Sequence, residues 1–377
     1  MSNLLRIELL NRLFKIKNNW LNVLYVHTPF CLQKCFYCVY SSKVPSSNKE
    51  MAEFYEKVIP QQIEQYKITL DNVNFDQIYF GGGTPTIADA DTLESLFRKI
   101  PNFKSIPKKM TEASPYTITD EHIDLFHRYR FNYVSLGVQT LSNRILEKQN
   151  RLIVSEERLN HVCRQLDKRN IISNLDLIFF LDSGDLEDLR ESEKDLDCLM
   201  SGIRPVSITI HFNYMIKKKV EKREAMIKLI KKMMDKFHEY QCTNALLEDS
   251  DIENDLKLSA EYRLMRREKN FYFYMTPKIP QSHSFGYNML ALGEYQKFKP
   301  KYNYFYVYDN TDKYALLEML KRYHTIALDF INARKKLGLD CQDYVDIDDF
   351  FCSEKGEKDF KEIIRKEGIP RFNSRQL

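Results

Sequence analysis

Short apolar runs alternate with amphipathic stretches between about residues 20 and 215, and this alternation constrains the fold more than any other feature of the sequence. Six of the apolar runs have the length and composition of strands. The strands that we predict are Leu21–Val26, Phe75–Phe80, Lys109–Ala113, Tyr133–Val138, Ser173–Phe180 and Val206–Phe212. The intervening stretches have a helical period, and the predicted helices are Met51–Tyr66, Asp91–Ile100, Thr119–Arg130, Ser155–Arg169 and Leu186–Met200, with Asp91, Thr119 and Ser155 as N-caps.

Strands that alternate with helices predict an α/β fold built from parallel β/α units. Six such units form either an open sheet or a partial barrel. In a barrel of this type, the functional residues lie at the carboxyl ends of the strands.

The chain beyond Tyr214 follows a different pattern, so we divide it into residues 1–19, residues 20–215 and residues 216–377. Met215–Tyr240 predicts an amphipathic helix with a solvated basic face, and a nucleic-acid or membrane surface is the alternative. The later elements that we predict are strands at Asn270–Met275 and Tyr302–Tyr308 and a helix at Asp312–Leu337. Residues 216–377 are therefore expected to form a smaller mixed α+β region.

Composition excludes several classes of protein. The 377 residues are 43% hydrophobic and 29% charged, which excludes a wholly disordered chain. The 57 Lys and Arg residues nearly balance the 53 Asp and Glu residues, so no global field attracts nucleic acid. No apolar run is long enough to span a bilayer, and the N-terminus lacks the features of a signal peptide. We therefore expect a cytoplasmic protein with reduced thiols.

Three of the eight cysteines form a tight group, Cys31, Cys35 and Cys38, just after the first predicted strand. Soft thiolates at this spacing favour an iron–sulfur cluster, zinc or copper(I). A [4Fe–4S] cluster held by only three thiolates has one iron open to another ligand. A structural zinc site needs a fourth ligand, for which His27 is the nearest candidate, and chance clustering is the remaining alternative.

Polar and glycine residues follow the other predicted strands. Gly81, Gly82 and Gly83 allow close backbone approach to a ligand, although a simple turn has the same composition. Glu112 and Gln139 lie at the ends of the third and fourth predicted strands, Asp176 lies within the fifth, and Arg151 opens the helical region after Gln139. Each of them alone is commonly an ordinary strand-end or capping residue. Together they offer two carboxylates, an amide and a guanidinium, and this set suits a ligand that contains adenosine and an amino acid.

The order of these motifs resembles the radical S-adenosylmethionine (SAM) superfamily: Cys-x3-Cys-x2-Cys, then Gly-Gly-Gly-Thr-Pro, then Gly-Val-Gln, then Asp-Leu-Ile. Within it, the sequence from Leu24 to Cys31 resembles the branch of oxygen-independent coproporphyrinogen III oxidases. That branch also contains haem chaperones and radical methylases. The resemblance covers residues 20–215 closely and is thin beyond them.

The resemblance implies a partial (β/α)6 TIM-like barrel and an enzyme that uses a [4Fe–4S] cluster held by Cys31, Cys35 and Cys38. An electron from the cluster would cleave SAM to a 5′-deoxyadenosyl radical that abstracts hydrogen from an organic substrate. The residues that align with SAM contacts in the family are Tyr25, Tyr37, Gly82, Gly83, Thr84, Glu112, Gln139, Arg151 and Asp176. No catalytic residue of the protein itself is assigned.

The resemblance also implies partners. Some members of the branch bind a second SAM, and Met215 falls near a backbone contact to it. The expected partners are a small-molecule or peptide substrate and a reducing electron donor such as flavodoxin or ferredoxin, without nucleic acid or a membrane span. Residues 216–377 would select the substrate, and the apolar stripe of Asn3–Ile16 suggests that residues 1–19 form a lid.

The sequence departs from the branch at several substrate-side positions. Tyr40 replaces the fourth cysteine of the porphyrin-forming oxidase, and Phe179–Gly184 replaces the usual Gly-Leu-Pro-Gly-Gln run. The haem motif of the chaperone is reduced to Gly286–Leu290, with His283 upstream as a candidate axial ligand. These departures weaken every specific substrate assignment, and we expect radical methylation or another modification of a peptide or natural product. Coproporphyrinogen decarboxylation, with Lys217–Lys219, Arg263, Arg266 and Arg267 as propionate-binding candidates, and haem delivery are the alternatives.

Overall fold

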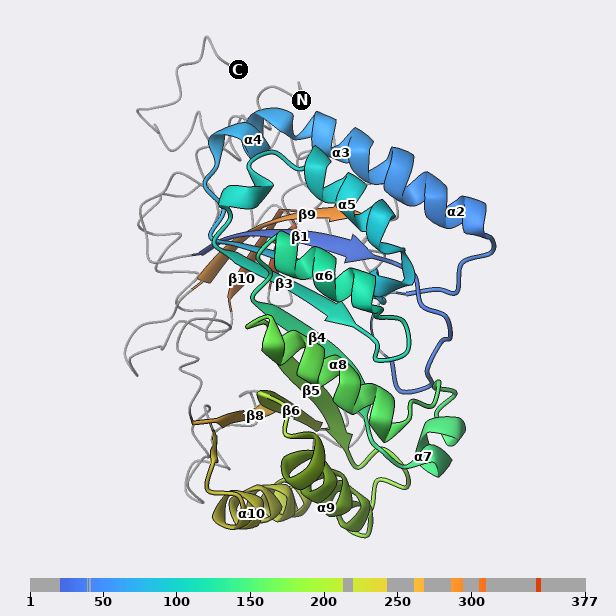
Figure 1. Cartoon of the computed structure of the whole chain (residues 1–377), viewed down its shortest axis with the longest axis vertical. Helices are drawn as coiled ribbons and strands as arrows, with labels where there is room; N and C mark the ends of the chain where they lie inside the picture. Colours follow the sequence, from blue (N-terminus) through green and yellow to red (C-terminus); the bar gives the residue numbers. More distant parts are fainter. Residues whose placement is uncertain are drawn as a thin grey trace, which may run out of the picture.

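The structure is a computed structural model, and it describes residues 21–38, 40, 42–212, 220–242, 261–267, 286–293, 305–309 and 344–346. The strands of these residues form one sheet in the order β11-β10-β9-β1-β2-β3-β4-β5-β6-β8-β7 (Figure 1). Its centre consists of six parallel strands in sequence order: β1 (Leu21–Thr28), β2 (Gln77–Gly82), β3 (Lys108–Ala113), β4 (Tyr133–Gln139), β5 (Ile172–Phe179) and β6 (Ser207–Phe212). This arrangement confirms the predicted partial (β/α)6 barrel, in which the sheet does not close on itself within the described residues.

Helices line one face of the sheet (Figure 1). They are α2 (Asn48–Glu53), α3 (Ile59–Gln65), α4 (Lys67–Asn72), α5 (Ala90–Lys99), α6 (Asp120–Arg128), α7 (Asn143–Lys148), α8 (Glu156–Lys168), α9 (Asp188–Cys198) and α10 (Val220–Lys236). The π-helical turn Phe54–Val58 joins α2 to α3, so the predicted helix Met51–Tyr66 is helical almost throughout. A second π-helical turn, Leu199–Ile203, follows α9.

The helix N-termini follow local hydrogen-bonding rules. Thr119 caps α6 and Ser155 caps α8, as predicted, because each hydroxyl accepts a backbone N–H three residues ahead. The prediction of Asp91 as an N-cap is wrong. Asp89 caps α5 by accepting the Thr92 N–H at 2.7 Å from an extended backbone, and Asp91 lies in the first helical turn. Both carboxylates favour a helix N-terminus, so the pattern alone allows either.

Two apolar layers lie on the two faces of the sheet. The larger packs the strands against the helices and is rich in aromatic side chains, among them Phe80, Phe97, Phe126 and Phe131. The smaller lies on the inner face and contains Met110, Tyr133, Val206 and Met265. Side chains alternate between the two faces of a strand, so the next inward-facing residues after Met110 on β3 and Tyr133 on β4 lie nearer the carboxyl ends of these strands.

Strands from beyond residue 215 extend both edges of the central sheet. β9 (Gly286–Gly293) pairs in parallel with β1, and β10 (Phe305–Asp309) and β11 (Tyr344–Asp346) follow outward as antiparallel strands. At the other edge, β8 (Glu261–Arg266) pairs antiparallel with β6, and β7 (Tyr240–Cys242) pairs with β8. β10 confirms the predicted strand near Tyr302–Tyr308. The division at residue 215 remains a prediction.

Several predicted elements lie outside the described residues. These are the helix in residues 1–19, the strand Asn270–Met275, the helix Asp312–Leu337, the sites Met215 and His283, and the basic run Lys217–Lys219. Among the helices that the structure describes, none combines the length and the hydropathy that crossing a bilayer requires.

The pairing of β9 with β1 depends on a glycine. Gly293 lies opposite His27 with φ +98°, and a Cβ there would overlap the His27 carbonyl oxygen. Its N–H donates to Gln62 Oε1 at 2.6 Å. The position therefore accepts no side chain without a shift of one of the two strands.

We expect Gly293→Ala to lower the free energy of unfolding by about 1–3 kcal/mol, because it combines left-handed strain with a backbone clash. Urea denaturation of the full chain measures this. Gly202→Ala is the matched control, because a Cβ at Gly202 meets nothing within 4 Å. Equal stability of the two variants would contradict the docking of β9 on β1.

Candidate functional site

The loop that carries the three cysteines begins directly after β1. Its two ends are tied together because the Cys31 N–H donates to the Lys43 carbonyl at 2.9 Å and the Lys43 N–H donates to the Pro29 carbonyl at 2.7 Å. Within the loop, the Cys38 N–H donates to the Cys35 carbonyl at 3.2 Å. All three thiols are free and partly exposed. The loop is therefore a closed turn that presents three thiols at the carboxyl end of β1.

Residues from other strand ends contact these thiols. The Thr84 hydroxyl, which follows β2, donates to Cys31 Sγ at 3.5 Å. Arg151, which lies between α7 and α8, donates to Cys35 Sγ at 3.6 Å and to the Tyr37 hydroxyl at 2.9 Å. Its second amino group donates to the Gly137 carbonyl on β4. Three residues predicted from the sequence, Tyr37, Thr84 and Arg151, are thus brought to the cysteine loop.

The donor set fits a multinuclear cluster better than a single ion. Burial raises the pKa of the Cys31 thiol, the Thr84 and Ser42 hydroxyls lower it, and the charges of Cys38 and Cys35 raise it. Three thiolates this close are stable only beside positive charge, which iron supplies. Among the described residues, no three His, Cys, Asp or Glu side chains converge on one ion position. Each thiolate of a cubane binds a different iron, so a cubane does not require such convergence.

The zinc alternative finds no support in the position of His27. Its ring is buried, and its Nδ1 shares a hydrogen bond with the Tyr25 hydroxyl at 3.1 Å. The ring lies against Gly82, where an added Cβ would overlap it. His27 is therefore a packed residue between the strand ends and not a fourth ligand in this structure.

The glycine edge lies along the end of β1. The Gly83 N–H donates to the Thr28 carbonyl at 2.6 Å, and the Thr84 N–H donates to the Phe30 carbonyl at 2.7 Å. Gly82 has φ +102°, which disfavours any other residue. The packing of β1 alone thus requires Gly82 and Gly83, and their contact with SAM remains a prediction.

The two predicted carboxylates face the barrel interior from β3 and β5. Glu112 accepts the Tyr79 hydroxyl at 2.8 Å and the Gly82 N–H at 3.2 Å. Burial and, to a smaller extent, the charge of Asp176 raise the pKa of Glu112 to about 7, against the opposing effect of these hydrogen bonds. Asp176 accepts the Ser135 hydroxyl and the Asn174 amide, each at 2.7 Å.

His211 completes this group from β6, with its Nε2 3.6 Å from Asp176 Oδ1. Sequence reasoning did not select His211 because it lies inside an apolar strand. The signal was present, since His211 alternates with the inward-facing polar residues Ser207 and Thr209.

Tyr25 and Gln139 lie on the same inner face. The Tyr25 ring stacks on Tyr79 with 5.9 Å between centroids. Gln139 ends β4 with φ +73° at a shift in the pairing with β5. The Gln139 amide and the Arg151 guanidinium both lie over Gly137: a Cβ added there would be 2.9 Å from the Gln139 Nε2 and 3.0 Å from an Arg151 amino nitrogen. The predicted SAM-contact residues therefore occupy one end of the barrel.

The remodelled run after β5 is held by acidic side chains. Asp182 pairs with Arg144 at 2.7 Å and with Lys148 at 2.6 Å. The Asp188 carboxylate, at the start of α9, accepts the Ser183 and Gly184 N–H groups at 3.0 and 2.8 Å. The loop has a defined conformation without the usual glycine–proline sequence of the branch.

The basic residues of β8 do not surround the mouth. Arg266 pairs with Asp167 at 3.1 Å, and the Arg267 Nε donates to the His238 carbonyl at 2.8 Å. Because β8 runs antiparallel to β6, both residues lie beyond the amino end of β6, opposite the cysteine loop. Arg263 is buried within the sheet and donates to the Thr209 hydroxyl at 3.2 Å. None of the three is placed to meet a carboxylate at the mouth.

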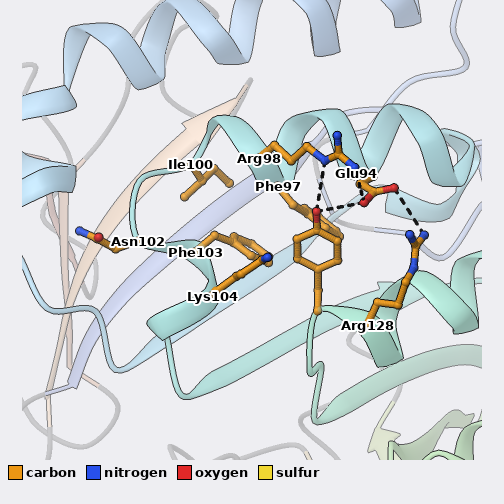
Figure 2. A pocket seen from close by; sticks show the side chains of 9 residues that line it. Glu94, Phe97, Arg98, Ile100, Asn102, Phe103, Lys104 and Arg128 are labelled. Carbon is orange, nitrogen blue, oxygen red and sulfur yellow. Dashed lines mark hydrogen bonds and ion pairs between the residues drawn. The ribbon is translucent and has the colours of Figure 1, made fainter.

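A cleft of about 630 Å³ lies elsewhere, in the outer helical layer between α5 and α6 (Figure 2). Figure 2 shows Glu94 bonded to Arg98 and Arg128 across it, and Glu94 also accepts the Tyr129 hydroxyl at 3.1 Å, so the carboxylate that lines the cleft is paired. None of the predicted site residues lines this cleft.

Comparisons with known proteins agree with this geometry. Residues 25–196 match the family model described as Radical SAM superfamily. The chain is 29% identical over 194 residues to the haem chaperone HemW of Buchnera aphidicola. This alignment covers 50% of this chain and 51% of that protein. It is 31% identical over 201 residues to the oxygen-independent coproporphyrinogen-III oxidase-like protein HemZ of Bacillus subtilis, which covers 50% of this chain and 38% of that protein. These alignments thus span about half or less of the relatives' length.

Two further matches extend over most of the chain. The oxygen-independent coproporphyrinogen III oxidase of Helicobacter pylori is 25% identical over 394 aligned positions, which cover 96% of this chain and 82% of that protein. The solved structure of coproporphyrinogen III oxidase (HemN) from Escherichia coli superposes with a TM-score of 0.57 at 14% identity, over 98% of this chain and 83% of that chain. The match to the solved HemN structure shows a shared fold.

The family match therefore assigns residues 25–196, which contain the three-cysteine loop and most of the barrel, to a radical SAM domain. Within that superfamily, the chain's relatives are the oxygen-independent coproporphyrinogen III oxidases and the haem chaperones, which confirms the predicted branch.

Arg151 ties the cysteine loop to β4, and its loss should loosen the loop. We expect Arg151→Met to weaken iron retention about tenfold or more, the usual cost of removing a residue that supports metal ligands. Release of iron to a competing chelator after anaerobic reconstitution measures this. Arg158→Met is the matched control, because Arg158 donates to the Ile118 carbonyl on the outer layer. If both variants release iron alike, Arg151 does not support the site.

Proposed function

We propose that Cys31, Cys35 and Cys38 hold a [4Fe–4S] cluster and that the protein reductively cleaves SAM. The observation that carries this proposal is the contact of Thr84 and Arg151 with two of the three thiols. These contacts join the cysteine loop to the ends of β2 and β4, which neighbour the strands that bear Glu112 and Asp176. When bound, such a cluster supplies the electron that converts SAM to methionine and a 5′-deoxyadenosyl radical.

The chain's own residues would bind and orient SAM. Arg151 and Gln139 lie together beside the cysteine loop, where a guanidinium and an amide can bind a carboxylate. Glu112 and Asp176 can accept from ribose hydroxyls or an ammonium group. The stacked Tyr25 and Tyr79 rings offer an apolar surface on the same inner face. A flavodoxin or ferredoxin in a reducing compartment is the electron donor that we propose.

The substrate is a separate proposal. The substitution of Tyr40 for a cysteine and the remodelled loop after β5 support methylation or another modification of a peptide or natural product. The long alignment with the Helicobacter pylori enzyme supports a second candidate, coproporphyrinogen III decarboxylation, and the HemW match supports haem delivery. The positions of Arg263, Arg266 and Arg267 weaken the decarboxylation candidate. Coproporphyrinogen, haem and cell extract, added in turn to the reduced enzyme, distinguish these possibilities.

We expect the anaerobically reconstituted protein to release 5′-deoxyadenosine from SAM when reduced with dithionite. Cys31→Ala, Cys35→Ala and Cys38→Ala should each abolish the release, because every thiolate binds a different iron. Chromatography of the products measures it. Cys163→Ala is the control, because Cys163 is buried in the outer layer. Release that persists in any of the three variants would refute the proposal.

The pKa of Glu112, about 7, gives SAM binding a pH dependence. A protonated Glu112 accepts fewer hydrogen bonds, so the SAM dissociation constant should fall about three- to tenfold as the pH rises through this pKa. Tyr79, Asp176 and His211 are the titratable groups that face Glu112.

Equilibrium dialysis between pH 6 and pH 8, a range that brackets the Glu112 pKa of about 7, measures the effect. Glu112→Gln should flatten the profile, and His211→Gln should retain it. A slope that survives in Glu112→Gln and disappears in His211→Gln would assign the titration to His211 instead.

A further inference from the structure

A layer of polar side chains lies in the barrel interior directly below Asp176. It contains Ser135 from β4, Asn174 from β5, and Ser207 and Thr209 from β6, with exposed fractions of 6%, 0%, 0% and 1%. Polar groups buried so completely require partners, because an unpaired one costs the full desolvation penalty. Their hydrogen bonds account for every polar atom of Asn174.

The two ends of this network set the direction of its hydrogen bonds. Arg263 can only donate, and its Nε donates to the Thr209 hydroxyl at 3.2 Å. The Thr209 hydroxyl therefore donates its own proton to Asn174 Oδ1 at 2.9 Å. The Ser207 hydroxyl donates to the same oxygen, also at 2.9 Å. With its oxygen occupied in this way, Asn174 directs its amide nitrogen toward the mouth.

The Asn174 Nδ2 group makes two donations. One goes to Asp176 Oδ1 at 2.7 Å and the other to the Ser135 hydroxyl at 2.9 Å. Ser135 in turn donates to Asp176 Oδ2 at 2.7 Å. Each Asp176 oxygen thus accepts one hydrogen bond from below. The reversed amide would set an oxygen against the carboxylate, so Asp176 and Arg263 favour the same orientation.

Asp176 remains open on its other side. Its side chain is 20% exposed and that of the neighbouring His211 is 34% exposed, so a ligand at the mouth can reach both. Each carboxylate oxygen has a second lone pair for that ligand. A carboxylate held from below by two donors is a pre-formed acceptor, and binding to it requires little reorganisation.

We propose that Asn174 is a positioning residue that holds both Asp176 oxygens as acceptors facing the mouth, so that the site selects ligands with hydroxyl or ammonium donors. The inference rests on the proposed function, in which the ribose and the amino group of SAM are such donors. Asn174 does not itself touch the ligand, because it is wholly buried beneath Asp176. Ser135 acts on the same carboxylate from β4.

The test compares SAM binding to the reconstituted full-length protein by equilibrium dialysis. Asn174→Ala should raise the dissociation constant about tenfold or more, the expected effect of losing donors to a buried charge. Ser135→Ala should raise it about threefold or more, and Ser135→Thr, which retains the hydroxyl, should restore it. Ser173→Ala is the control, because Ser173 is equally buried but faces the opposite side of β5. Ser173→Ala should leave the SAM dissociation constant within about twofold of the wild-type value, while it lowers the melting temperature about as much as Ser135→Ala does.

A double-mutant cycle separates positioning from general destabilisation. In an Asp176→Asn background, Asn174→Ala and Ser135→Ala should each change the dissociation constant by less than about twofold, because their effect passes through the carboxylate. The inference is overturned if Asn174→Ala and Ser135→Ala weaken SAM binding equally in the wild-type and Asp176→Asn backgrounds. It is also overturned if these variants bind SAM as well as Ser173→Ala does. If Asn174→Ala does not fold, the Ser135 variants decide alone.

The failure of the proposed function can be told apart from the failure of this inference. A wild-type protein that loads no cluster and binds no SAM refutes the proposed function itself. Normal wild-type binding with unaffected variants refutes only the role of Asn174.

Discussion

The parallel pairing of β1 with β2 is the interaction on which the site depends. It sets the carbonyls of Thr28 and Phe30 against the N–H groups of Gly83 and Thr84, and the same step brings the Thr84 hydroxyl to Cys31. The cysteine loop and the glycine edge are therefore one structural unit. On the other side of β1, Gly293 repeats the requirement for a residue without a side chain. His27 is enclosed between two glycines with positive φ, Gly82 and Gly293, so neither position accepts a side chain without a shift of β1 or its neighbours.

The inner face of the barrel changes character along the strands. Met110, Tyr133 and Met265 form an apolar floor, the buried layer around Asn174 lies above it, and the ionisable groups Glu112 and Asp176 lie above that layer. Charge is thus concentrated where a ligand enters. Burial disfavours the ionised form of Glu112 and raises its pKa to about 7.

The six central strands and the helices between them could be predicted because each carries its own periodicity and each prediction needs only neighbouring residues. Thr119 and Ser155 were identifiable as N-caps for the same reason. β8 and β9 could not be predicted, since their partners β6 and β1 lie far away in the sequence and neither strand has a strong pattern. Arg263 illustrates the consequence. Its contact with Thr209 depends on the β6–β8 register, so the sequence alone left it as a candidate for propionate binding.

The cysteines and the strand-end residues were identifiable from their order, but the shape of the mouth depends on α9. Asp188 at the start of that helix holds the loop after β5, and Asp195 one turn before its end accepts the Thr140 hydroxyl and the Leu141 N–H from the loop after β4. Burial raises the pKa of Asp195 to about 6, which is the cost of holding a loop with a buried carboxylate. Two neighbouring rim loops are thus anchored by one helix. The positions of both rim loops therefore depend on α9.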